Sequence, residues 1–127
     1  MPECYESFHV DGTLKEREFW ADGKRHNENG PAWEQWNATG RLIYCQFWVD
    51  GQEHNEAGPA YEWWADSGRL IYREYSVHGK RHNACGPAIE WWNSRGCCTH
   101  REFWVHGEKI TEDEFLALQM TKSAAKQ

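Results

Sequence analysis

Apolar and polar positions recur along this chain with a period of 28 residues. The phrase His-Asn-x-x-Gly-Pro-Ala occurs at 26–32, 54–60 and 82–88, and an aromatic-rich stretch follows each copy. Short runs rich in aromatic and β-branched residues, bounded by turn residues, are typical of β-strands, whereas helices need longer periodic runs. The pattern therefore predicts a repeat array of antiparallel β-hairpins.

Two series of glycines mark the predicted turns, one at Gly12, Gly40, Gly68 and Gly96 and the other at Gly23, Gly51, Gly79 and Gly107. Residues that precede them, such as Thr39 and His78, are poor at positive φ, which a type I′ turn requires at both central positions. We therefore predict in every copy a type I turn followed by a left-handed glycine that forms a G1 bulge.

The predicted sheet carries apolar residues on both faces. With a three-residue turn, Trp36 pairs with Leu42. The next pairs bring Glu34 opposite Tyr44 on the same face, while Trp33 points to the other side, because successive strand residues alternate. A flat sheet would leave one apolar face in water, so we expect the sheet to curl strongly, or to bury its second face against itself or a partner.

The last part of the chain has a different pattern. Thr111 is followed three residues later by Glu114, with acidic residues between them, which is a capping box at a helix start. We predict a helix from about 112 to 122 that covers the open end of the array, followed by a frayed tail. The predicted fold is all-β: a curled antiparallel meander of about three and a half 28-residue β-hairpin repeats over residues 1–110, with a C-terminal capping α-helix and tail over 111–127 of the same domain.

The composition is rich in aromatic residues and acidic. Leu, Ile and Val together number 13, whereas Trp, Tyr and Phe number 19, so any core must be built mainly from aromatic rings. Twenty Asp and Glu against fourteen Lys and Arg give a net charge of −6, which argues against direct binding to nucleic-acid phosphates or anionic lipid. The sequence starts without the regions of a signal peptide, no apolar run approaches the roughly 20 residues of a membrane span, and the five cysteines show no paired spacing. We therefore expect a cytoplasmic protein with free thiols.

Three segments carry a recognisable pattern: Trp-Val-Asp-Gly at 48–51, His-Asn-Glu-Ala-Gly-Pro-Ala at 54–60 and Thr-Glu-Asp-Glu-Phe at 111–115. These segments resemble the MORN-repeat variant class of bacterial and phage proteins. The resemblance extends from about Tyr5 to Phe115. It implies β-hairpin repeats and a binding role rather than catalysis.

The repeated histidines His26, His54 and His82 invite a metal-binding interpretation. Equivalent residues of successive repeats lie two or three strands apart, roughly 10–15 Å, whereas zinc needs its ligands at about 2.0–2.3 Å from one centre. We expect each imidazole to hydrogen-bond a loop carbonyl beside the Gly-Pro. In the third repeat, Cys85 and Cys97 lie about 20 Å apart at opposite ends of one hairpin. We therefore predict neither a metal nor another cofactor.

Candidate binding residues come from positions where the repeats differ. The sequence contains no nucleophile, phosphate-binding or dinucleotide-binding motif, so we predict a protein without enzymatic activity. Trp63 and Trp91 occupy a position where the earlier copies have Ser or Gln, which is unlike deep core. Trp is a frequent interface anchor, so we expect Trp63 and Trp91 to bind a partner.

A second candidate set consists of Glu34, Glu62 and Glu90, which recur in mid-strand together with Glu6. Mid-strand is a poor place for Glu by propensity. One interpretation is a row of carboxylates, each bonded to a neighbouring Tyr hydroxyl or turn N–H. The other is an acidic stripe that meets Lys or Arg of a partner.

These observations together predict a non-enzymatic protein-binding module. The resemblance to phage proteins suggests a phage-type inhibitor that blocks a host defence or nucleic-acid-handling protein by occupying its surface. The alternatives are a carbohydrate-binding aromatic repeat protein and a structural oligomer. The expected partner is another protein, such as a host nucleic-acid-binding protein, or a second copy in a homodimer, with no direct contact to nucleic acid or membrane.

Overall fold

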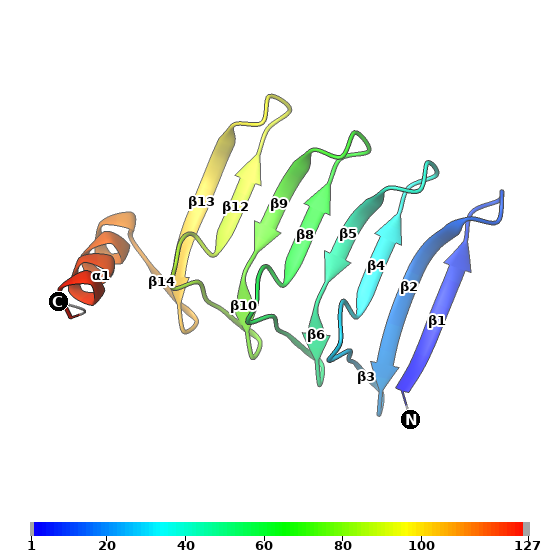
Figure 1. The fold of residues 1–127 in the computed structure, drawn as a ribbon, viewed down its shortest axis with the longest axis horizontal. Coiled ribbons are helices and arrows are strands. Elements are labelled where there is room, and N and C mark those ends of the chain that lie inside the picture. The colour runs from blue at the N-terminus through cyan, green and yellow to red at the C-terminus, as the bar shows by residue number, and fades with distance from the viewer. Residues whose placement is uncertain (1, 126–127) are drawn as a thin grey trace.

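The chain folds into an open antiparallel sheet with one helix at its C-terminal end (Figure 1). The computed structural model describes residues 2–125. The elements are β1 (Pro2–Phe8), β2 (Leu14–Ala21), β3 (Lys24–Arg25), β4 (Trp33–Trp36), β5 (Leu42–Gln46), β6 (Trp48–Val49), β7 (Gln52–Glu53), β8 (Tyr61–Trp64), β9 (Leu70–Glu74), β10 (Ser76–Val77), β11 (Lys80–Arg81), β12 (Ile89–Trp92), β13 (Cys98–Val105), β14 (Glu108–Ile110) and α1 (Glu112–Ala125).

The main sheet has ten strands, and its hydrogen-bonded neighbours follow the order β1-β2-β4-β5-β8-β9-β12-β13-β14, with β3 paired to β2. Two small sheets, β6-β7 and β10-β11, lie off this path. Each repeat therefore combines a long hairpin with a short hairpin at its opposite end (Figure 1). The predicted all-β meander of hairpins with a C-terminal helix is confirmed.

The turns of the long hairpins have the predicted geometry. Gly40 has a φ of 87°, and its N–H donates to the Asn37 carbonyl at 3.0 Å. The Asn37 N–H donates across the turn to the Arg41 carbonyl at 2.8 Å. Glycines with positive φ occupy the same place in the other long hairpins, at Gly12, Gly68 and Gly96. A type I turn followed by a left-handed glycine is therefore confirmed for this series.

The turns of the short hairpins differ from the prediction. Asp50 has a φ of 51° and Gly51 has a φ of 77°, so both central residues are left-handed and the turn is type I′. His78 and His106, which also precede glycines, have the same φ of 51°. The predicted G1 bulge is wrong here because only two residues join the paired strands. Asp and His enter this region more readily than most other non-glycine residues.

The strand register of the long hairpins also differs from the prediction. A β-bulge lies between Gln35 and Trp36, so that Gln35 faces Tyr44 and Glu34 faces Cys45. The predicted pairing of Glu34 with Tyr44 is wrong, because the extra residue lies one pair inside the hairpin rather than in the turn alone. Tyr44 therefore lies on the face opposite to Glu34.

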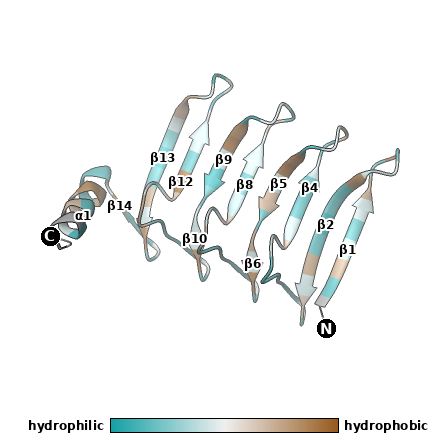
Figure 2. Ribbon diagram, viewed as in Figure 1, coloured by the Kyte–Doolittle hydropathy of each residue, from teal (hydrophilic) through white to brown (hydrophobic). Residues whose placement is uncertain are grey.

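The corrected register defines two faces of the sheet. The aromatic face carries the side chains of Trp33, Gln35, Tyr44, Trp63, Tyr72 and Trp91. The ladder face carries those of Glu6, Arg17, Glu34, Cys45, Glu62, Arg73, Glu90 and Arg101. Hydrophobic and hydrophilic residues follow one another along the long strands in Figure 2, as expected when both faces contain apolar residues.

The core is small for a chain of this length. No large side chain is fully buried within the described part of the chain. The buried apolar residues are Ala32, Cys45, Ala60, Ala88, Ile89, Phe103 and Phe115. Most aromatic side chains are therefore half-buried between neighbours of the same face, with no second layer of described residues over them.

The C-terminal helix begins at the predicted capping box. The Glu114 N–H donates to Thr111 Oγ1, and the Thr111 N–H donates to the Glu114 carboxylate, both at 3.1 Å. Phe115 packs against Phe103 with ring centroids 4.8 Å apart. The helix continues to Ala125, beyond the predicted end near residue 122, and the rest of the predicted tail lies outside the described residues. Within residues 2–125, no helix is long and apolar enough to cross a membrane.

Candidate functional site

Four rings from consecutive strands form a continuous strip on the aromatic face. We call it the aromatic strip, and it consists of Tyr44, Trp63, Tyr72 and Trp91. Tyr44 stacks on Trp63 at 5.5 Å, and Tyr72 contacts Trp91 at 4.4 Å between ring centroids. Trp63 and Trp91 lie edge to face at 6.1 Å. The two tryptophans singled out in the sequence are therefore neighbours in one surface, and Trp91 is 37% exposed.

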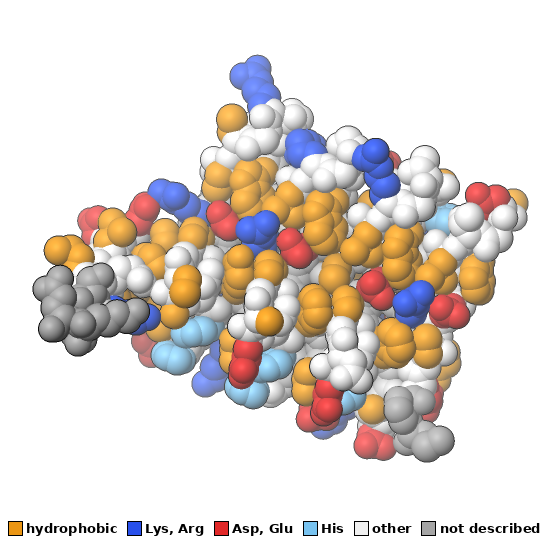
Figure 3. Space-filling view, viewed as in Figure 1, with side chains coloured by type: hydrophobic (Ala, Val, Ile, Leu, Met, Phe, Trp, Pro, Cys, Tyr) orange, Lys and Arg blue, Asp and Glu red, His pale blue; other side chains and the backbone are white. Residues whose placement is uncertain are grey.

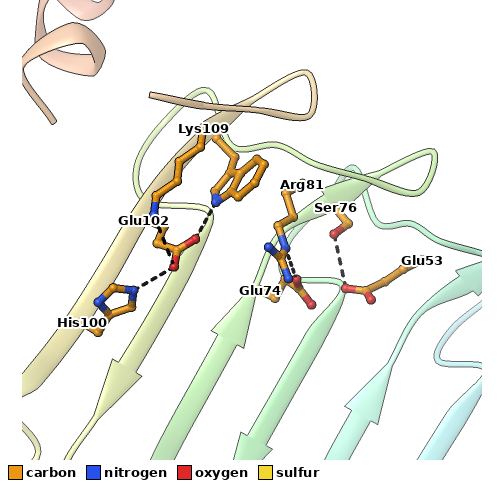
Figure 4. Close-up of polar contacts among 8 residues, drawn as sticks. Glu53, Glu74, Ser76, Arg81, His100, Glu102 and Lys109 are labelled. Carbon is orange, nitrogen blue, oxygen red and sulfur yellow. Dashed lines mark hydrogen bonds and ion pairs between the residues drawn. The ribbon is translucent and has the colours of Figure 1, made fainter. Parts of the chain in front are cut away.

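Polar side chains lie at both ends of the aromatic strip. At one end Gln35 pairs with Tyr44, and at the other His100 pairs with Trp91. His100 Nε2 lies 2.8 Å from the Glu102 carboxylate, as Figure 4 shows. Hydrogen bonds from His100 and Trp104 hold the pKa of Glu102 below its ordinary value. The strip is thus an apolar platform with hydrogen-bonding groups at its edges.

Two neighbouring carboxyl groups, buried Glu74 and half-buried Glu53, also lie on this side of the sheet. Glu53 stands where the other repeats have Arg25, Arg81 and Lys109, and it lies beside Glu74. Burial, followed by the Glu74 carboxylate, raises the pKa of Glu53 to about 8. Ser76 Oγ donates to Glu53 at 3.3 Å, and Arg81 Nε donates to Glu74 at 2.7 Å (Figure 4). Glu53 therefore holds its proton at neutral pH, while Glu74 pairs with Arg81.

This carboxyl pair predicts a pH dependence of stability. The pKa of Glu53 is raised above its ordinary 4.5 in the folded state. Its contribution to the free energy of unfolding is therefore fully present below pH 4.5 and is lost as the pH rises through about 8. Between pH 6 and pH 9 the wild type should lose unfolding free energy on the order of 1 kcal/mol, and Glu53→Gln should abolish this loss. Urea unfolding at both pH values measures it. Equal pH slopes in the variant and the wild type would contradict the assignment.

The ladder face carries a row of alternating charges across eight strands. Each residue is the direct cross-strand partner of the next, in the order Glu6, Arg17, Glu34, Cys45, Glu62, Arg73, Glu90 and Arg101. We call this row the charge ladder. Figure 3 shows acidic and basic side chains side by side across this face, with apolar side chains on both sides of the row. Glu112 of α1 ends the row with a 2.6 Å contact to Arg101.

The charge ladder corrects the first of the two sequence interpretations of the acidic residues, in which each carboxylate bonds a Tyr hydroxyl or a turn N–H. Glu34 and Glu62 do lie in one row, but arginines stand between the acids, with Arg17 Nη1 at 3.8 Å from Glu34 and Arg73 Nε at 3.5 Å from Glu62. Their partners are therefore neither Tyr hydroxyls nor turn amides, and the row is not uniformly acidic. The sequence contained the missing signal, because residues 17, 73 and 101 are arginines at multiples of the same 28-residue period.

Cys45 is the one position of the charge ladder that breaks the alternation. It is 7% exposed between Glu34 and Glu62. Burial, followed by the charges of these two acids, raises the pKa of the Cys45 thiol to about 12. Burial also raises the pKa of Glu34 and of Glu62, against the opposing effect of the nearby arginines. The centre of the ladder is therefore short of one positive charge.

This gap predicts a stabilising substitution. Cys45→Arg places a guanidinium between two half-buried carboxylates, as Arg73 is placed between Glu62 and Glu90. We expect the free energy of unfolding to rise by about 1 kcal/mol, since each such pair contributes about 0.2–1 kcal/mol. Urea unfolding compares it with Cys45→Ala, which removes the thiol without adding charge. An Arg variant less stable than the Ala variant would contradict this account of the ladder.

The two sets of candidate residues lie on opposite faces of the sheet. Trp63 and Trp91 belong to the aromatic face, whereas Glu34, Glu62 and Glu90 belong to the ladder face. The adjacent tryptophans Trp64 and Trp92 also point to the ladder face, because neighbouring strand residues alternate. One flat partner surface therefore cannot contact both candidate sets.

The repeated histidines connect successive repeats. His26 Nδ1, His54 Nδ1 and His82 Nδ1 each accept a hydrogen bond of 2.8–2.9 Å from the backbone N–H of the type I′ turn in the next repeat. The predicted acceptor, a loop carbonyl, is therefore wrong, and that role belongs to Asn55, whose Nδ2 donates to the Pro59 carbonyl at 2.9 Å. Each imidazole holds the strained turn of its neighbour in place.

One histidine cluster has the spacing of a metal site. The ligand atoms of His54, Glu56 and His78 lie within 4.8 Å of one another. However, His54 Nδ1 accepts a backbone hydrogen bond, so the ring proton lies on Nε2 and leaves that nitrogen no lone pair for a metal. This arrangement fits a structural contact between repeats better than a metal centre. Cys85, Cys97 and Cys98, which the sequence places in the same repeat, are free thiols on the surface.

Comparison with known proteins adds no further assignment. No family model matches the chain, and no curated protein sequence or solved structure matches it. The candidate surfaces therefore rest on the geometry of the chain itself.

Proposed function

We propose that this protein is a non-enzymatic binding module that recognises another protein through the aromatic strip. The observation that carries the proposal is the contiguity of Tyr44, Trp63, Tyr72 and Trp91 on an uncovered sheet face, with ring centroids 4.4–6.1 Å apart where they touch. Tyr and Trp bury large areas and dominate the energetics of protein interfaces. A preformed row of such rings loses little side-chain entropy on binding.

The partner we propose is a protein with a basic rim around an apolar contact. The chain has a net charge of −6, and charge complementarity increases the rate of association with a positively charged surface. Nucleic-acid-handling proteins have such surfaces. This supports the narrower proposal that the chain is an inhibitor, of the kind found in phages, that occupies the surface of a host defence or nucleic-acid-handling protein.

The adjacent tryptophans allow a closely matched test. Trp63→Ala with Trp91→Ala removes two rings from the aromatic strip, whereas Trp64→Ala with Trp92→Ala removes the same number from the ladder face of the same strands. We expect the first pair to weaken binding to a captured partner about a hundredfold or more, since each anchor contributes about 2 kcal/mol. We expect the second pair to bind like the wild type. Circular dichroism checks that both variants remain folded.

The opposite result would refute the proposal. If the Trp64 and Trp92 variant loses the partner while the Trp63 and Trp91 variant keeps it, binding does not use the aromatic strip. Loss of an enzymatic rate on substitution of one His or Cys would contradict the non-enzymatic assignment.

The aromatic strip also suits a carbohydrate, which is the second candidate function. Sugar rings stack on exposed indoles, and Gln35 and His100 supply hydrogen-bonding groups at the ends of the strip. A titration with oligosaccharides, followed by tryptophan fluorescence, separates the two functions. A saturable change that is absent in the Trp63 and Trp91 variant would favour the carbohydrate, and no change would favour a protein partner.

A further inference from the structure

We propose that the ladder face packs against the same face of a second copy, which forms a two-layer dimer. Protein domains are built from at least two packed layers, whereas the layer over this sheet within the described residues is α1, which packs on β13 at the C-terminal end. The proposal concerns the face opposite to the aromatic strip, so it does not depend on the proposed function.

Apolar side chains lie on both sides of the charge ladder, as Figure 3 shows. On the long-hairpin turn side they include Trp36, Ile43, Trp64, Ile71 and Trp92. On the short-hairpin side they include Phe19, Phe47 and Tyr75, each two residues beyond a ladder position and therefore on the same face. The equivalent residue Phe103 is covered by Phe115 of α1. Arg17 lies over the Trp36 ring at 5.3 Å, and Arg73 lies over the Trp92 ring at 5.5 Å, which confirms that these rings share the face with the ladder.

The charge ladder is complementary to itself about one particular axis. A two-fold axis parallel to the strands, passing between β5 and β8, lies at the centre of the eight ladder strands. It reverses the order of the row, so Glu6 meets Arg101 of the second copy and Glu34 meets its Arg73. Arg17 likewise meets the Glu90 of the second copy. The arrangement that gives the two ladder faces their greatest overlap is therefore also the one that brings opposite charges together across the interface.

The other way to superpose the two faces is unfavourable. A two-fold axis perpendicular to the strands keeps the order of the row, so every acid meets the same acid and every arginine the same arginine. Like charges in contact across an interface cost several kcal/mol. The charge ladder therefore selects the axis along the strands.

The residue at the centre of the row fits a dry interface. In the proposed arrangement Cys45 meets Glu62 of the second copy beside the axis. The small neutral thiol of Cys45 lets the two sheets approach closely.

The area of the face suffices for a specific dimer. Eight strands at ~4.8 Å and about five residues at ~3.3 Å give a face of roughly 600 Å² per chain. About 1,200 Å² in total lies at the lower end of specific protein interfaces. We therefore expect a dissociation constant in the micromolar range and a concentration-dependent dimer.

Two isoleucines of the ladder face provide the test. Ile43 and Ile71 occupy the position that is Lys15 in the first repeat, so the fold already contains a lysine at this site. Ile43→Lys with Ile71→Lys places four ammonium groups in the dimer interface. We expect analytical ultracentrifugation at protein concentrations from about 1 to about 100 μM to show a dimer for the wild type and a monomer for this variant. The variant should associate at least a hundredfold more weakly than the wild type.

The Trp63 and Trp91 alanine variant is the control, because it alters the other face and should remain dimeric. Partner binding by the isoleucine variant should persist, which separates this proposal from the proposed function. A wild type that is monomeric at every concentration would overturn the proposal. So would a dimer that the two lysines leave intact.

A charge exchange tests the axis without relying on the isoleucines. Glu6→Arg and Arg101→Glu each create two repulsive contacts in a dimer of identical variants, and each should weaken association at least tenfold. An equimolar mixture restores both pairs and should recover the wild-type dimer. Arg95→Glu, at an exposed hairpin tip, is the matched control and should change nothing. A mixture that associates no better than either variant alone would overturn the proposed axis.

Discussion

Phe115→Ala should lower the free energy of unfolding by about 3 kcal/mol, because truncation of a buried Phe typically costs 3–5 kcal/mol. Phe115 is 6% exposed and contacts Phe103, which is also 6% exposed. The ring fixes α1 on the last hairpin. Among the described residues, polar contacts also join Glu112 to Arg101 and the Gln119 amide to the Ala84 carbonyl in the preceding loop. Without the Phe115 ring the helix should detach and expose Phe103. Urea unfolding, followed by circular dichroism, measures both effects.

The neighbouring helix residues supply the control for this substitution. Leu116 and Leu118 are 50% and 44% exposed, so their truncation to alanine should change stability by less than about 0.5 kcal/mol. If the Leu variants destabilise the protein as much as Phe115→Ala does, then α1 packs on the array through a different face from the one described.

Asn55→Ala should lower the free energy of unfolding by about 2 kcal/mol, since a net hydrogen bond contributes about 1 kcal/mol. The Asn55 amide donates to the Pro59 carbonyl at 2.9 Å, and its oxygen accepts from the Ala57 N–H at 3.0 Å. These two bonds close the loop of the Gly-Pro-Ala phrase and direct the chain into β8. Asn27 and Asn83 make equivalent bonds in their repeats. Urea unfolding measures the loss.

Asn29→Ala provides the comparison, because it lies exposed in the equivalent loop of the first repeat and only its backbone N–H is engaged there. It should change stability by less than about 0.5 kcal/mol. Equal effects of the two substitutions would show that loop composition, rather than the side-chain bonds of Asn55, determines stability.

Local signals in the sequence predicted much of the fold. The 28-residue period located the hairpins, and the capping box located the start of α1 at Glu112. The G1 turns of the long hairpins followed from glycines preceded by residues that avoid positive φ. Each of these signals acts between residues close together in the chain, where backbone sterics and side-chain hydrogen bonds are decisive.

Features that depend on contacts between repeats could not be predicted in the same way. The His54 imidazole accepts a hydrogen bond from the backbone N–H of His78 in the next repeat, a contact 24 residues away in sequence. The bulge at Gln35 shifts Tyr44 to the other face, and a shift of one residue reverses every side chain. The candidate tryptophans and glutamates were therefore identified as repeated positions, but their separation onto opposite faces required the register.

The most direct test of the binding surface uses the indole N–H signals of the nine tryptophans in a ¹⁵N NMR spectrum, recorded during titration with a captured partner. The aromatic-strip account predicts that the signals of Trp63 and Trp91 shift or broaden, while those of Trp64 and Trp92 stay unchanged. Adjacent residues on the same strands report the two faces separately. Perturbation of Trp64 and Trp92 without perturbation of Trp63 and Trp91 would contradict the account.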